Sequence, residues 1–203
     1  MDTQQRDLLP VQYFHVVFTV PAELPDLFLA APRVTYTGLF AAVAETLAQV
    51  AFRRLGSTIA LTAILHTWTQ LLLFPPHLHC IVPGGGLDPG HTHWICTRAD
   101  FFLPVRVLAE VVRGTLLATR ETAIDRAEIP RRRDEDPHAL LTRAAATRWV
   151  VSCKPPFACP EQGLASLASD THRIAISNDR LVSLPDGQGP RSARTDPAAR
   201  GPR

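Results

Sequence analysis

The stretch that decides the fold runs from Pro75 to Gly86 and reads PPHLHCIVPGGG. Two histidines, His77 and His79, flank one leucine, and an apolar run follows before three glycines, where we expect the strand to stop. Alternate side chains of a β-strand share a face, so both imidazoles point to one side while Leu78 points to the core. Two imidazoles held side by side on a rigid strand suit a divalent metal ion. The run therefore predicts a strand that carries a candidate metal site.

Strand-like and helix-like patterns alternate along the chain before this stretch. Residues 12–20 are almost continuously apolar and β-branched, which predicts a central strand covered on both faces, with His15 as a packed core histidine. After a turn-rich connector, apolar residues at helical spacing predict a helix over 37–55, with Gly56 as its C-cap. Residues 57–68 return to a β-like composition, and we expect them to form a hairpin with the histidine strand.

The alternation continues after this stretch. Residues 91–96 predict a short edge strand with a second His-x-His pair, and we expect His91 and His93 on the surface because the threonine between them is a poor core anchor. The remaining predicted segments follow in chain order: a turn at 87–90, an amphipathic helix at 104–124, a charged connector at 126–137, a short helix at 138–147, a strand at 149–153 that Lys154 and the prolines after it break, a helix from 160 to about 169, and a hairpin of strands 172–177 and 180–184.

The order of these elements predicts an α/β protein of the α+β type. Its centre is expected to be a mixed, largely antiparallel sheet covered by helices. A chain of 203 residues buries one good core and has little room for a second. We expect a lead-in at 1–10, one domain at 11–185 and a disordered tail at 186–203, where glycine, proline, arginine and serine replace apolar residues.

The composition of the chain says more about its cellular compartment than about its function. The net charge of +2 is too small to predict nucleic-acid binding, and Lys154 is the only lysine among 21 basic residues. The first residues lack the basic start and apolar core of a signal peptide, and no apolar run reaches the length of a membrane span. The four cysteines form no Cys-x-x-Cys pair, which argues against a zinc knuckle. These features favour a cytoplasmic chain with reduced thiols and no membrane partner.

Several ordered blocks of the chain resemble one family of enzymes. The blocks are residues 9–19 (LPVQYFHVVFT), 64–68 (ILHTW), 77–86 (HLHCIVPGGG), 153–157 (CKPPF), 160–162 (PEQ) and 171–178 (THRIAISN). From about residue 8 to residue 184 the chain is similar to the catalytic domain of HUH transposases, the two-tyrosine type that moves rolling-circle insertion sequences. Six ordered blocks are far more specific than one His-x-His pair. The resemblance implies an HUH-nuclease-like fold.

The resemblance also implies a chemistry, which is the metal-dependent nicking and rejoining of single-stranded DNA at the ends of a mobile element. In that family a tyrosine hydroxyl attacks a phosphodiester and leaves a 5′ phosphotyrosine, while a divalent ion, Mg²⁺ or Mn²⁺, polarises the scissile phosphate. By this resemblance His77 and His79 are metal ligands. A third ligand is usual in the family, and Gln70 and His66 are both candidates for it.

The expected nucleophiles are missing from this chain. The family places two tyrosines one helical turn apart, just before the Thr-His-Arg block, so that both hydroxyls lie on one helix face. Those positions carry Ser166 and Asp170, and the two tyrosines of the chain, Tyr13 and Tyr36, match neither. Family members usually also have a cysteine-rich zinc module before this domain and more folded chain after it. We therefore expect a degenerate, truncated copy that binds DNA and metal but has lost nicking.

Contacts with DNA phosphates are expected from Lys154 and Arg173, which lie close in sequence to the helix that would carry the nucleophiles. Two other functions stay open. One is a non-catalytic DNA- or RNA-binding module that uses an α/β sheet as its platform. The other is a histidine-dependent phosphoesterase, because residues 66–69 (HTWT) match a single His-x-Thr element.

Overall fold

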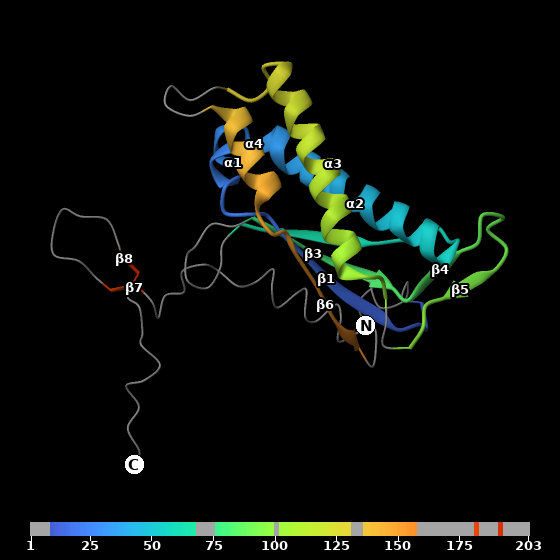
Figure 1. Ribbon diagram of the computed structural model, residues 1–203. Coiled ribbons are helices and arrows are strands. Elements are labelled where there is room, and N and C mark those ends of the chain that lie inside the picture. Colours follow the sequence, from blue (N-terminus) through green and yellow to red (C-terminus); the bar gives the residue numbers. More distant parts are fainter. Residues whose placement is uncertain are drawn as a thin grey trace, which may run out of the picture.

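A computed structural model of the chain describes residues 9–67, 76–99, 102–130, 136–157, 181–182 and 191–192. Its centre is a four-stranded sheet in the order β2-β3-β1-β6, and every pair of neighbours is antiparallel. The strands are β1 (Tyr13–Thr19), β2 (Thr62–His66), β3 (His77–Pro83) and β6 (Val150–Phe157). This arrangement confirms the α+β fold with a largely antiparallel sheet, the predicted β2–β3 hairpin pairing and the central position of β1 (Figure 1).

Helices cover one face of this sheet (Figure 1). They are α1 (Pro25–Ala30), α2 (Pro32–Leu55), α3 (Val105–Asp125) and α4 (Pro137–Ala146). Phe14, Val16 and Phe18 of β1 belong to one buried cluster with Leu78 and Cys80 of β3 and with the apolar stripes of these helices. Because side chains of a strand alternate, the residues between them point to the opposite face. The histidines of β3 therefore lie on the face that these helices do not cover.

Two prolines correct the prediction of a turn-rich connector before the long helix. Pro25 and Pro32 each occupy the first turn of a helix, so α1 forms within the connector and α2 begins five residues earlier than the periodicity indicated. Proline fits there because its fixed φ is helical and its missing N–H has no partner to lose in the first turn. The C-cap prediction is confirmed, since Gly56 has φ 68° and its N–H donates to Phe52 O at 2.9 Å.

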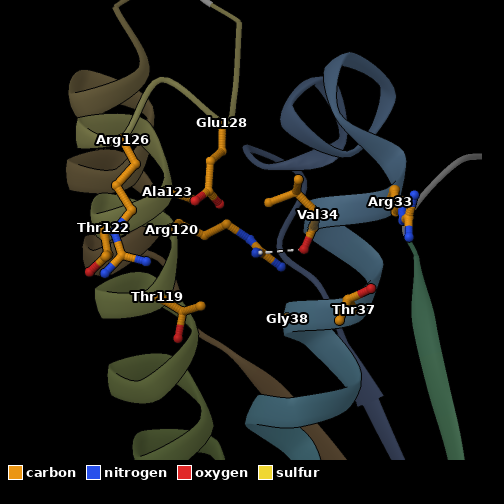
Figure 2. Close-up of a pocket in the computed structure, with 10 residues that line it drawn as sticks. All are labelled: Arg33, Val34, Thr37, Gly38, Thr119, Arg120, Thr122, Ala123, Arg126 and Glu128. Carbon is orange, nitrogen blue, oxygen red and sulfur yellow. Dashed lines mark hydrogen bonds between the residues drawn. The ribbon is translucent and has the colours of Figure 1, made fainter.

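The side chain of Arg120, on α3, points toward α2 and links the two helices (Figure 2). Its side chain is 1% exposed, its guanidinium donates to Val34 O at 3.4 Å and to Thr35 O, and it lies 5.4 Å from the ring centre of Phe28. Burial lowers the pKa of this guanidinium to about 10, which keeps it charged at neutral pH. A Cβ on Gly38 would come within 2.6 Å of its Nη1 atom, so α2 needs a glycine where Arg120 enters.

Strand β3 ends at Pro83, directly before the three glycines, as the sequence predicted, and a second, two-stranded sheet begins at Gly85. Gly85–Leu87 forms strand β4 and pairs antiparallel with β5 (Trp94–Cys96). A Cβ on Gly84 would lie 2.5 Å from Cγ of Gln12, and one on Gly86 would meet the backbone of Thr58. The glycines therefore also allow close approach of neighbouring chain segments at the place where β3 ends.

The second His-x-His pair lies at the tip of this hairpin, as predicted for surface residues. His91 and His93 are exposed, and the side chain of His93 is 83% accessible. The carboxylate of Asp88 accepts hydrogen bonds from the backbone N–H groups of Thr92 and His93 at 2.7 and 2.8 Å. The loop is thus closed by its own aspartate.

Strand β6 continues through the two prolines that were predicted to break it after Cys153. Lys154 pairs with His15 and Phe157 pairs with Tyr13, so β6 uses one more residue than β1 over this step. The extra residue falls at Pro155 and Pro156. A proline has no N–H to donate to a neighbouring strand. A bulge in an edge strand leaves a residue unpaired, so proline is tolerated there.

Several predicted segments lie outside the described residues, among them the helix at 160–169 and the strand at 172–177. Within the predicted 180–184 strand, β7 (Leu181–Val182) pairs with β8 (Arg191–Ser192). The three cysteines described, Cys80, Cys96 and Cys153, are free thiols, as expected. Among the helices that the structure describes, each is too short or too polar to cross a bilayer.

Candidate metal centre

The register of the β2–β3 pair brings three histidines to one place on the face of the sheet away from the helices. His66 of β2 lies directly opposite His77 of β3, and Ile64 lies opposite His79. Residues directly opposite each other on one face have Cβ atoms about 5 Å apart, and diagonal neighbours are about 7–8 Å apart, within reach of long or aromatic side chains. The predicted same-face arrangement of His77 and His79 therefore extends across the hairpin to include His66.

The three rings form a compact cluster. Ring centres are 5.4 Å apart for His66 and His77, 4.2 Å for His66 and His79, and 5.0 Å for His77 and His79. One nitrogen from each ring lies within 4.8 Å of the others. Ligand nitrogens around an ion at about 2.1 Å are no more than about 4.2 Å apart, so a small closing of the rings would suffice to hold an ion. The residues present fit a divalent metal.

The surroundings of the cluster keep its central imidazole neutral. Partial burial, together with the neighbouring His66, His15, His77 and Lys154, lowers the pKa of His79 to about 3. A neutral imidazole has a free lone pair on one nitrogen, which is the form that coordinates metal ions. At neutral pH His79 is therefore ready to act as a ligand.

His15 is buried as predicted, but it also belongs to the surroundings of this cluster. Its side chain is 1% exposed, and its Nε2 atom lies 2.9 Å from Nδ1 of His79. In the β1–β3 register His15 faces Ile81 while Val17 faces His79, which makes the two histidines diagonal neighbours on one face. Sequence reasoning missed this contact because it depends on strand register, which the sequence of one strand does not contain.

Lys154 lies on the same face of the sheet as the histidines. It is exposed and pairs with His15 across the β1–β6 ladder. Strand β1 lies between β6, which carries Lys154, and β3, which carries His77 and His79. Lys154 and these histidines are thus two strand spacings apart, each of about 4.8 Å. A backbone phosphate bound near the histidines would lie within reach of this ammonium.

The two tyrosines of the chain lie away from the cluster. Tyr13 is on the histidine face, but four strand positions, or roughly 13 Å, separate it from Val17, the partner of His79. Its hydroxyl accepts a hydrogen bond from the backbone N–H of Leu9 at 3.0 Å. Tyr36 belongs to α2, on the other side of the sheet, and packs 5.2 Å from the ring of Phe28. Neither hydroxyl is placed to attack a phosphate held at the histidines.

The other candidate site residues, Gln70, Ser166, Asp170 and Arg173, lie outside the described residues. Their roles therefore stay predictions, as do the domain boundaries at 10 and 185. In the part of the chain that the structure describes, the three-histidine cluster is the one group of potential metal ligands that comes together.

Comparison with known proteins shows which family the chain belongs to. A family model described as "Putative transposase" (Y2_Tnp) matches residues 60–189, which is more than half of the chain and includes all three clustered histidines. The chain belongs to this transposase family. The resemblance to two-tyrosine transposases inferred from the sequence blocks is confirmed.

Two curated proteins resemble this transposase-family chain. It is 45% identical over 198 residues to "Putative transposase y4qJ" of Sinorhizobium fredii (strain NBRC 101917 / NGR234), a match that covers 92% of this chain and 49% of that protein. It is 38% identical over 87 residues to "Transposase for insertion sequence element IS801" of Pseudomonas savastanoi pv. phaseolicola, covering 42% of this chain and 21% of that protein. The chain thus spans about half the length of the first relative and about a fifth of the second.

Proposed function

We propose that this transposase-family chain binds single-stranded DNA from the ends of a mobile element across a divalent metal held by His66, His77 and His79. The observation that carries the proposal is the convergence of three imidazoles on the face of the sheet away from the helices. DNA is the partner that a transposase implies, and a sheet face can serve as a platform for an extended single strand. His66 is our choice of third ligand, because it already lies beside His77 and His79.

The donor set favours one metal over the other. Imidazole nitrogens suit transition ions such as zinc best, and Mn²⁺, although it also favours oxygen ligands, belongs to that series, whereas Mg²⁺ keeps carboxylate, carbonyl and water oxygens. We therefore propose Mn²⁺ rather than Mg²⁺ as the working ion. When bound, such an ion would polarise a phosphodiester oxygen and offset its negative charge. The residues of the chain would position that phosphate, with Lys154 beside it.

Nicking is a separate matter from binding, because it needs a nucleophile. The positions at which the family has its tyrosines carry Ser166 and Asp170. A serine alkoxide is much harder to form than a phenolate, whose parent hydroxyl has a pKa of about 10, and a carboxylate repels phosphate. We propose that the chain by itself retains metal and DNA binding and has lost the covalent step.

The experiment that tests this function uses the full chain and a fluorescent oligonucleotide that carries the end of the element. We expect Mn²⁺ to raise the affinity for single-stranded DNA relative to EDTA, and His77→Ala to remove that gain while His91→Ala keeps it. Equal affinity in EDTA would favour a nucleic-acid-binding module that does not use the histidines. A covalent protein–DNA adduct on a denaturing gel would overturn the loss of nicking.

Lys154 provides a second check of the DNA-binding face. Replacing it with glutamine is expected to weaken single-strand binding about 3- to 10-fold and to lower the slope of log K against log salt by about 0.7, the value for one lost phosphate contact. Fluorescence anisotropy at several salt concentrations measures both quantities.

The control for this measurement is Arg53→Gln, because Arg53 is an exposed cation in the last turn of α2, on the helical side of the sheet. It should leave the salt slope unchanged. An unchanged slope for Lys154→Gln, or an equal drop for both variants, would contradict a specific phosphate contact at Lys154.

A further inference from the structure

We propose that His15 is a positioning residue for the metal centre, which it serves by fixing the orientation and the tautomer of His79. The inference rests on the proposed function, since it assumes that His79 binds a metal. It concerns a residue that is not one of the three clustered ligands. His15 would act through its hydrogen bond to His79 and not by touching the ion or the DNA.

The geometry of the contact supports this role. The two rings approach through Nε2 of His15 and Nδ1 of His79, 2.9 Å apart, with ring centres 4.9 Å apart and planes inclined by 40°. Only one nitrogen of a neutral imidazole carries a proton, so one ring must donate and the other accept. If Nδ1 of His79 donates, its Nε2 atom is unprotonated and free to coordinate. His15 then accepts through Nε2 and carries its own proton on Nδ1.

The placement of His15 in the fold supports it as well. His15 lies in the middle of the central strand and is 1% exposed, whereas His77 and His79 are only half-buried. Its neighbours Phe14 and Val16 are buried in the main core on the opposite face, so the backbone at His15 is firmly held. A ligand that has to lose rotational freedom on binding metal gains affinity when a fixed group already holds it.

Two amide substitutions separate positioning from packing. Glutamine places an amide near the position of Nε2 of histidine, and asparagine, one methylene shorter, places it near Nδ1. His15→Gln is therefore able to accept from His79, and His15→Asn is not. We expect His15→Asn to weaken Mn²⁺ binding 10- to 100-fold and His15→Gln to stay within about threefold of the wild type. The electron paramagnetic resonance signal of free Mn²⁺, titrated with the full chain, measures both affinities.

The outcomes distinguish this inference from the proposed function. If the wild type binds Mn²⁺ and the His79→Ala variant does not, the metal site is supported. In that case, wild-type affinity for Mn²⁺ in His15→Asn would overturn the role of His15 alone. Binding by His15→Gln that is as weak as binding by His15→Asn would overturn it too. If the wild type and His79→Ala bind Mn²⁺ equally, the metal site itself fails. Thermal melts in EDTA show whether each variant folds.

A measurement on the unmodified protein keeps the inference testable even if His15→Asn does not fold. In the Zn²⁺-loaded chain, long-range ¹H–¹⁵N correlation spectra report which nitrogen of each histidine carries a proton. We expect His79 to be protonated on Nδ1 and His15 to have an unprotonated Nε2. A proton on Nε2 of His79 in the zinc-loaded protein would overturn the assignment.

Discussion

Replacing His79 with alanine is expected to weaken Mn²⁺ binding at least about 100-fold, more than the loss of an outer hydrogen-bond partner of a metal ligand costs. The imidazole of His79 is the centre of the cluster, since its ring lies within 5.0 Å of the rings of His66, His77 and His15. Its removal takes away one ligand and the contact that joins the cluster to β1. Isothermal titration calorimetry with Mn²⁺ measures the change.

The matched control comes from the second His-x-His pair of the chain. His93→Ala removes an imidazole of the same kind from an exposed loop, so we expect it to leave the affinity for Mn²⁺ within about twofold. His66→Ala tests the choice of third ligand: a loss close to that of His79→Ala supports His66. Wild-type affinity in His66→Ala would instead favour Gln70. Equal effects of His79→Ala and His93→Ala would contradict the site.

Gly85→Ala is expected to lower the free energy of unfolding by about 3 kcal/mol. Gly85 has φ +153°, a conformation that residues with a Cβ rarely adopt, and an added Cβ would meet the backbone O of Ile95 and lie 2.6 Å from Nε1 of Trp94. The methyl group therefore forces β4 and β5 apart as well as straining the backbone. Urea denaturation followed by circular dichroism measures the loss.

Gly114→Ala is the control for this substitution, because it makes the same chemical change in the middle of α3. Apart from its chain neighbours and the backbone of its own helix, no described atom lies within 4 Å of the Cβ that it would add. Alanine in an exposed helix interior stabilises by about 0.5–1 kcal/mol relative to glycine. The two variants should thus change stability in opposite directions. Gly85→Ala within 1 kcal/mol of the wild type would contradict the close packing of the hairpin.

The period of two along β3 was enough to predict that His77 and His79 share a face and that Leu78 is buried. It was not enough to choose between His66 and Gln70, because the choice depends on how β2 is aligned with β3. A shift of one residue in that register would turn His66 to the helix-covered face. The same limit applies to His15, whose burial followed from its apolar neighbours but whose contact with His79 required the β1–β3 register.

Proline and glycine caused the other differences between prediction and structure. Pro32 was taken as part of a connector and Pro155 as the end of a strand, whereas the first begins a helix and the second lies in a bulge of β6. In both places the residue has no N–H to contribute and none is needed. The glycines were correctly expected to end β3, but strand β4, which begins at Gly85, was not expected, and the small size of Gly85 is what allows β4 and β5 to pair. The structural effect of a proline or a glycine depends on which distant segments pack beside it, and the local sequence does not contain that information.

The most direct test of the account is the location of bound manganese in crystals of the full chain. Anomalous scattering measured from crystals grown with Mn²⁺ should give its strongest peak between the rings of His66, His77 and His79, on the face of the sheet opposite α2 and α3. A peak of full occupancy elsewhere, with none at these three rings, would contradict the claim that the sheet of this transposase-family chain is built to hold a metal.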